Sequence, residues 1–158
     1  MEEGIVQIFY GPGKGKSSAA LGNAIRAAGT GKKVYIVQFL KSPENPEYMA
    51  RLEPEIKIFR FERSEGTFSE LSDEEKQEEK KNIENGLNFA KKALTTGECD
   101  VLVLDEILGV IAEGVADVSE VTGIVKQKSP FGTVVLTGRE LPEELKECAD
   151  EIMQITAE

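Results

Sequence analysis

One glycine-rich stretch of the chain reads Gly11-Pro12-Gly13-Lys14-Gly15-Lys16-Ser17-Ser18. It follows an apolar run, Ile5–Tyr10, whose β-branched and aromatic residues predict a strand. It leads into Ser17–Ala28, whose composition predicts a helix that ends at Gly29. A strand, a glycine-rich turn and a helix in this order are typical of a loop that cradles phosphate groups.

The stretch fits the pattern G-x-x-x-x-G-K-[ST], except that its first glycine is displaced by one position, to Gly11. Glycines at 11, 13 and 15 allow positive φ angles, so successive backbone N–H groups can face one concave site. The helix start adds partial positive charge there. Lys16 is expected to neutralise terminal phosphate oxygens, and Ser17 to place its hydroxyl on Mg²⁺. The alternative is a glycine-rich turn that merely joins strand to helix.

The remaining sequence alternates strand-like and helical segments. This alternation predicts an α/β fold of the P-loop NTPase kind, with a mostly parallel sheet and helices on both faces. We expect one nucleotide-binding domain over residues 1–158. Ser72 and Glu75 form a possible capping box at the start of a long helix that ends at Gly97. The other expected strands are Lys33–Leu40, Ile56–Phe61, Val101–Leu104, Thr133–Thr137 and an edge strand at Ile152–Ile155; the other expected helices are Val118–Val125 and Pro142–Cys148.

Two further strand ends carry polar side chains. Val101–Leu104 runs directly into Asp105 and Glu106. Carboxylates at the carboxyl end of a parallel strand lie where ligands bind, so these acids are candidate Mg²⁺ ligands, directly or through water. Ordinary loop acids are the alternative. Arg139 follows another strand end and is a candidate contact for phosphate or substrate, with a plain surface arginine as the alternative.

Composition excludes several function classes. The chain has 29 Asp and Glu residues against 19 Lys and Arg residues, a formal net charge of -10, which argues against nonspecific nucleic-acid binding. Histidine is absent, which excludes Ser/His/Asp and Cys/His catalysis. No apolar run approaches the roughly 20 residues that span a bilayer. We therefore expect a cytoplasmic protein with two reduced thiols, Cys99 and Cys148.

Taken together, several segments resemble the P-loop class of ATP:corrinoid adenosyltransferases. Their order and spacing cover nearly the whole chain, and their combination is more specific than any single motif. The segments are Gly4–Gly22, Arg26-Ala27-Ala28-Gly29-Thr30-Gly31, Val37-Gln38-Phe39-Leu40-Lys41, Leu104-Asp105-Glu106 and Leu136-Thr137-Gly138-Arg139, with Glu47 at the position of a glutamate common in the family.

The resemblance implies that cobalt(I) of a reduced corrinoid attacks the 5′ carbon of ATP and expels the whole triphosphate. Such a nucleophile needs no protein base, which suits a chain without histidine. Lys14 and Lys16, with the loop amides and Mg²⁺, would stabilise the leaving triphosphate. Arg26, Gln38 and Lys41 are then candidates for placing the nucleotide. The resemblance also suggests a homodimer and an electron-donor flavoprotein as a partner.

The sequence departs from the family pattern in the loop before the long helix. The family usually has a glycine-phenylalanine-x-tryptophan run there, whose rings crowd the lower face of the corrinoid. Here the run is Gly66-Thr67-Phe68-Ser69, and the chain has no tryptophan. Phe68 either does part of this work or is a core phenylalanine. The family also usually continues beyond the point where this sequence ends.

Two other functions are compatible with the motifs. A P-loop kinase or ATPase would cleave the γ-phosphate with the same loop and acidic strand end. A non-catalytic nucleotide or corrinoid sensor would fit the missing tryptophan. The identity of the products separates these functions from adenosyl transfer.

Overall fold

The architecture, taken from a computed structural model that describes residues 3–40, 50–62 and 67–157, is an α/β fold around one sheet. The six-stranded sheet has the order β3-β2-β4-β5-β1-β6, and every neighbouring pair is parallel. The elements are β1 (Val6–Tyr10), α1 (Lys16–Gly29), β2 (Val34–Gln38), β3 (Ile56–Arg60), the 3₁₀-helix η1 (Phe68–Glu70), α3 (Asp73–Thr96), β4 (Val101–Asp105), α4 (Ile107–Ala112), α5 (Val118–Lys126), β5 (Thr133–Gly138), α6 (Glu143–Lys146) and β6 (Glu151–Gln154).

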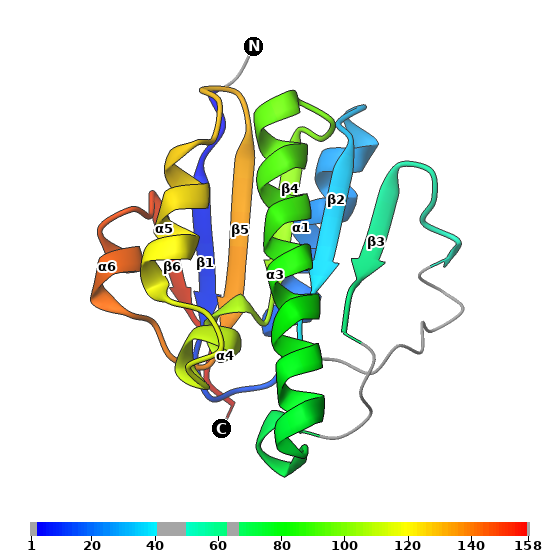
Figure 1. The fold of residues 1–158 in the computed structure, drawn as a ribbon. Coiled ribbons are helices and arrows are strands. Elements are labelled where there is room, and N and C mark those ends of the chain that lie inside the picture. The colour runs from blue at the N-terminus through cyan, green and yellow to red at the C-terminus, as the bar shows by residue number, and fades with distance from the viewer. Residues whose placement is uncertain (1–2, 41–49, 63–66, 158) are drawn as a thin grey trace.

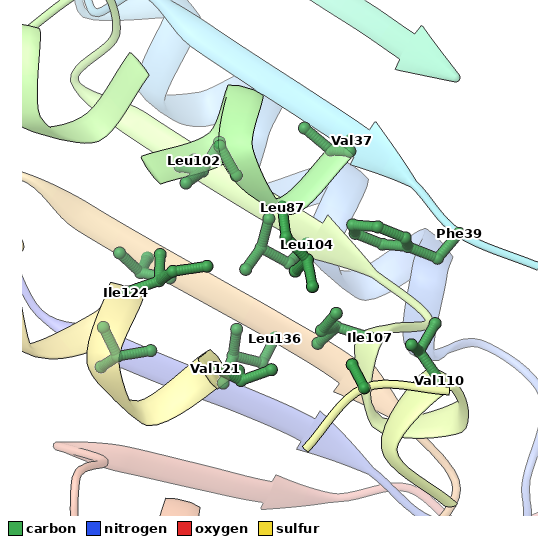
Figure 2. Close-up of a cluster of buried hydrophobic side chains, with 14 of the residues drawn as sticks. Val37, Phe39, Leu87, Leu102, Leu104, Ile107, Val110, Val121, Ile124 and Leu136 are labelled. Carbon is green, nitrogen blue, oxygen red and sulfur yellow. The ribbon is translucent and has the colours of Figure 1, made fainter. Parts of the chain in front are cut away.

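Alternating side chains of the central strands build two separate cores. On one face, Leu102 and Leu104 of β4 pack under α3 and α5, where Leu87, Val121 and Ile124 meet them (Figure 2). On the other face, Val101 and Val103 of the same strand pack with Ala20 and Ala24 of α1. Because neighbouring residues of a strand point to opposite faces, a wholly apolar strand is buried on both sides. The expected helices on both faces are confirmed.

The parallel arrangement brings all strand carboxyl ends to one edge of the sheet, the lower edge in Figure 1. The loop after β1 and the chain segment after β4 both begin there. Ligands of open parallel sheets bind beyond this edge. The fold therefore places the glycine-rich loop and the acidic strand end on the same side of the molecule.

The long helix α3 follows its local sequence signals closely. Ser72 accepts a hydrogen bond from the Glu75 amide, and the Glu75 carboxylate accepts one from the Ser72 amide. Gly97 ends the helix in the left-handed conformation. Ile83 and Leu87 lie on its buried face, against the sheet. The predicted capping box and C-terminal glycine are confirmed.

Some expected elements need correction. The predicted helix Pro142–Cys148 is a single turn, Glu143–Lys146, and Pro142 is its N-cap rather than its first helical residue. The expected strand Ile152–Ile155 lies at the sheet edge, one residue earlier. Sequence reasoning missed α4, a six-residue helix directly after Glu106. No sequence signal for a helix start precedes its apolar residues. The residue before the helix is Glu106, which takes the left-handed conformation that usually belongs to glycine.

Within the described ranges, no helix combines the length and apolar character that crossing a membrane requires. Cys99 is buried and Cys148 half-buried, and both are free thiols, as expected. Burial, together with the neighbouring carboxylates Asp100 and Glu98, raises the pKa of Cys99 to about 12. A thiol with so high a pKa is not a nucleophile at neutral pH.

Candidate active site

The start of α1 is open to an anion. The helix begins at Lys16, and its N-cap is Gly15 in the left-handed conformation, with φ 112°. No side chain caps the first turn, and that turn contains no acidic residue. The first amides of a helix have no intrahelical acceptor and carry the positive end of the helix dipole. A phosphate group is the kind of ligand that satisfies both properties.

The first half of the loop is fixed by two strands on either side of β1. The Gly11 amide donates to the carbonyl of Gly138, at the end of β5, over 3.1 Å. The Gly13 amide donates to the carbonyl of Ile155, directly after β6, over 3.1 Å. The loop is thus held in place before any ligand binds.

This packing corrects the expected role of one glycine. Gly11 and Gly15 have positive φ, as predicted, but Gly13 does not. A Cβ on Gly13 would lie 2.7 Å from the Ala157 amide nitrogen, and one on Gly11 would lie 2.3 Å from the Ile155 carbonyl oxygen. Gly13 is therefore required by the close approach of the C-terminal segment and not by its own backbone angles.

The two loop lysines differ in their surroundings. Lys16 is buried, and its ammonium group donates to the Gly13 carbonyl over 2.7 Å, so its charge lies at the mouth of the loop. Lys14 is exposed. Of the two, Lys16 is held in place, while Lys14 is a surface charge beside the same loop.

Asp105 is the centre of a hydroxyl network under the loop. It is buried, and its Oδ1 accepts one hydrogen bond from the Ser17 hydroxyl and one from the Thr137 hydroxyl, each over 2.8 Å. Ser17 comes from the first turn of α1 and Thr137 from the end of β5. Three elements distant in sequence therefore meet at one carboxylate, and two of the three candidate Mg²⁺ ligands, Ser17 and Asp105, are brought into contact.

Glu106 lies beside this network in an unusual conformation. Its φ is 64°, and its amide donates to the Thr137 hydroxyl over 2.8 Å. Its side chain extends along α4, because a Cβ on Gly109 would lie 3.4 Å from Glu106 Oε2. The structure thus brings Glu106 to the predicted edge of the sheet, with a backbone conformation that the surrounding contacts must maintain.

Gln38 and Arg139 also lie at strand ends. Gln38 is buried, aligned with Asp105 across the sheet, and its side-chain oxygen accepts a hydrogen bond from Arg60 Nε over 2.5 Å. Arg139 is exposed and directly follows Gly138, the residue that anchors Gly11. Both predicted residues therefore lie at the correct edge of the sheet, Gln38 inside it and Arg139 on its surface.

Two predicted residues, Arg26 and Phe68, lie in other parts of the fold. Arg26 is exposed in the last turn of α1, about 15 Å along the helix axis from Lys16. Phe68, in η1, is half-buried against the larger core, with the Lys76 ammonium group 5.9 Å from its ring centroid. Lys41 and Glu47 lie outside the described residues. Within this chain, the structure does not bring Arg26 to the loop.

Sequence reasoning did not select two residues near the site. Thr137 ends the expected strand Thr133–Thr137, and a hydroxyl at the end of an apolar strand is a usable signal. Glu62 had no signal: it is buried, and its Oε1 accepts the Leu40 amide over 2.7 Å. Burial raises the pKa of Glu62 to about 7; the Leu40 hydrogen bond opposes this, and Glu79 and Glu113 reinforce it.

The donor set fits Mg²⁺ rather than a softer metal. In the described part of the chain, no three His, Cys, Asp or Glu side chains converge on a possible metal position. One hydroxyl and one carboxylate at the mouth of a phosphate loop are hard oxygen donors. Mg²⁺ typically takes one or two such protein ligands and completes its coordination with phosphate oxygens and water.

Comparison with known proteins gives a consistent result. The sequence profile described as "ATP:corrinoid adenosyltransferase BtuR/CobO/CobP" matches residues 2–158. The corrinoid adenosyltransferase of Escherichia coli K12 is 31% identical over 154 residues, which cover 98% of this chain and 77% of that protein. Corrinoid adenosyltransferase CobA of Salmonella typhimurium is 30% identical with the same coverage.

A solved structure supports the fold alone. The chain of EssC, ATPases 2 and 3, from Geobacillus thermodenitrificans superposes with a TM-score of 0.53 at 18% identity, covering 99% of this chain and 33% of that one. The family match, in contrast, extends over almost the full sequence. The chain belongs to the ATP:corrinoid adenosyltransferase family.

Proposed function

We propose that this member of the family transfers the 5′-deoxyadenosyl group of ATP to cobalt(I) of a reduced corrinoid, with the triphosphate held on residues 11–18. The observation that carries the residue assignment is the 2.8 Å contact between the Ser17 hydroxyl and the Asp105 carboxylate at the mouth of the loop. The family match over residues 2–158 supports the reaction. Both substrates, ATP and the corrinoid, are small molecules.

In this reaction the protein has to assist the leaving group rather than the nucleophile. The cobalt(I) electron pair forms a bond to C5′ while the C5′–O5′ bond breaks, and the bonding electrons leave with the triphosphate. No proton has to be removed from the nucleophile. The protein must therefore orient ATP and stabilise negative charge on the triphosphate.

Each of these tasks has residues suited to it. The first-turn amides of α1 and the buried Lys16 ammonium group provide fixed positive charge at the loop. Ser17 and Asp105 would hold Mg²⁺, which supplies further charge neutralisation when bound. Lys14 and Arg139, both exposed, are suited to secondary contacts with phosphate oxygens. Pro12 and Ser18 complete the loop, and Gln38 at the buried edge of the sheet is proposed to support nucleotide placement.

The corrinoid side of the proposal rests on Phe68. Its half-buried ring lies at the start of the segment that leads into α3, the position where the family pattern has its aromatic run. We propose that this ring crowds the lower face of the corrinoid. Arg26 is remote from the loop of its own chain. It could take part in nucleotide placement only if it reached the loop of another chain, for example in the homodimer that the family resemblance suggests.

The partner that supplies electrons is proposed to be a flavoprotein, as the family resemblance suggests, because cobalt(I) requires a strong one-electron reductant. Size-exclusion chromatography with light scattering tests the homodimer. The flavoprotein partner is tested by replacing the chemical reductant with a flavodoxin that is continuously re-reduced, and by measuring whether the corrinoid is then reduced.

The decisive experiment identifies the products. The protein is incubated with ATP, Mg²⁺ and chemically reduced cobalamin, and the products are separated by chromatography. The proposal requires adenosylcobalamin and inorganic triphosphate in equal amounts. ADP and phosphate with unchanged cobalamin would instead indicate a kinase or ATPase, and tight ATP binding without any product would indicate a sensor.

A further inference from the structure

Thr137 connects the two acidic residues at the end of β4. Its side chain is fully buried at the end of β5. Its hydroxyl donates to Asp105 Oδ1 over 2.8 Å and accepts the Glu106 amide over 2.8 Å. One hydroxyl therefore contacts the side chain of the first acid and the backbone of the second.

This double contact fixes the direction of both hydrogen bonds. A threonine hydroxyl has one proton and two acceptor lone pairs. The Glu106 N–H group can only donate, so the hydroxyl accepts there and directs its single proton to Asp105. A hydrogen bond to a carboxylate is stronger than one between neutral groups. β5 thus contributes one hydrogen bond to the orientation of the Asp105 carboxylate, in addition to the one from Ser17.

The same hydroxyl helps to hold an unfavourable backbone conformation. Glu106 has φ 64°, which costs a residue with a side chain about 1–2 kcal/mol. Such a conformation persists only where surrounding contacts maintain it. The Thr137 contact to the Glu106 amide is one such contact, and it lies where α4 starts.

Ser17 gives the comparison that isolates the role of Thr137. Both hydroxyls donate to the same oxygen of Asp105, but Ser17 is itself a proposed Mg²⁺ ligand. A hydroxyl that coordinates a cation turns a lone pair toward it and no longer orients its neighbour in the same way. Thr137 is buried behind Asp105 and has no such second task.

We propose that Thr137 is a positioning residue for the cation site: it holds the Asp105 carboxylate and the Glu106 backbone in the arrangement that Mg²⁺·ATP requires. Thr137 does not touch the substrate. The inference rests on the proposed assignment of Asp105 to Mg²⁺, and it adds a residue that acts through Asp105. Residues that orient metal ligands in this way typically change metal affinity by about 10–100-fold when removed.

The test uses Thr137→Val, which keeps the shape of the side chain and removes the hydroxyl, and Thr137→Ser, which keeps the hydroxyl. ATP affinity is measured by calorimetry on the full chain without corrinoid, once with Mg²⁺ and once with EDTA. The ratio of the two affinities is the Mg²⁺ enhancement. We expect Thr137→Val to reduce this enhancement about tenfold or more while ATP affinity in EDTA changes less than about twofold. Thr137→Ser should restore most of the enhancement.

A full Mg²⁺ enhancement in folded Thr137→Val would overturn the proposal. So would equal losses of ATP affinity with and without Mg²⁺, because these indicate general damage to the site. Circular dichroism and thermal unfolding establish that each variant is folded. If Thr137→Val does not fold, Thr137→Ala takes its place, with the same expected loss and the same overturning result.

Asp105→Asn separates this inference from the proposed function. If Asp105→Asn removes the Mg²⁺ enhancement and Thr137→Val leaves it intact, only the role of Thr137 fails. If Asp105→Asn also leaves the enhancement intact, the assignment of Asp105 to Mg²⁺ fails, and the positioning role fails with it.

Discussion

Asp105 and Glu62 are two buried carboxylates near the same edge of the sheet, in opposite surroundings. Asp105 lies under the phosphate loop and accepts hydrogen bonds from two hydroxyls. Glu62 follows β3, on the far side of β2, accepts the Leu40 amide and faces the carboxylates Glu79 and Glu113. Two hydroxyl donors around a carboxylate at a strand end suit a cation site. Burial among other carboxylates instead raises the pKa of Glu62 and favours its protonated form.

This difference divides the site edge into two regions. The loop region comprises the ends of β1, β4 and β5 with residues 11–18. The β3 region comprises Glu62, η1 and the first part of α3, together with the ring of Phe68. The division predicts that substitutions in the loop region change ligand binding most, and that substitutions in the β3 region change stability, pH dependence or corrinoid handling.

The largest effect on ligand binding is expected from Lys16→Ala. Loss of the buried ammonium group should weaken Mg²⁺·ATP binding by about 100-fold, because a charge-assisted contact contributes about 1.5–3 kcal/mol and the helix start loses its fixed cation. Adenosylation should fall at least as much. Calorimetry and product formation measure the two effects. Lys126→Ala, which removes the same charge from an exposed position in the last turn of α5, is the matched control and should bind ATP normally. If Lys16→Ala bound ATP with wild-type affinity, the division into a loop region and a β3 region would be wrong.

Glu62→Gln should change the pH dependence of stability. The folded-state pKa of about 7 lies above the ordinary value of 4.5, so the native protein keeps a proton that the unfolded chain releases. Stability from this group is fully present below pH 4.5 and is lost as the pH rises through 7, a change of about 3 kcal/mol. Glutamine does not titrate, so Glu62→Gln should become the more stable protein above pH 7.

Urea unfolding of both proteins at pH 5, 6 and 8 measures this change. Glu55→Gln is the control, because Glu55 is exposed and lies before β3, at the other end of the strand. A constant difference between wild type and Glu62→Gln at all three pH values would contradict the prediction. ATP affinity at pH 8 should be the same in both, which separates the β3 region from the loop.

Gly13→Ala tests how the loop is held. Its new Cβ would lie 2.7 Å from the Ala157 nitrogen, so the C-terminal segment has to move. We expect a loss of about 1–3 kcal/mol in the free energy of unfolding, the usual cost of overpacking. Deleting residues 156–158 should remove most of this loss. Gly22→Ala is the control: it lies in α1 with open space around it and should stabilise the protein by about 0.5–1 kcal/mol.

Phe68→Ala is expected to have little effect on ATP binding. Because the ring packs against the hydrophobic core and is not among the residues proposed to hold the triphosphate, ATP affinity should stay close to that of wild type. Under the proposed role, reaction with a cobalt(II) corrinoid and a reductant should fall by several-fold more than reaction with pre-reduced cobalt(I). Equal losses with both substrates would show that Phe68 only contributes packing.

Local sequence signals account for much of this structure. The strand, loop and helix over residues 5–29 and the capping box at Ser72 depend on neighbouring residues, so their pattern is readable directly. The apolar strands also predicted a sheet buried on both faces. The sequence did not predict α4. This helix begins after Glu106, whose left-handed backbone conformation no residue propensity favours.

The sequence by itself determined that this chain is an α/β protein and predicted its phosphate loop, and its motifs pointed to the family that the comparisons show. Only the tertiary structure decided which partners meet there. The C-terminal segment explains Gly13, β5 supplies Thr137 to Asp105, and α1 carries Arg26 away from the loop. The physical reason is range: propensities and turns act over a few residues, whereas these contacts join segments brought together only by sheet order.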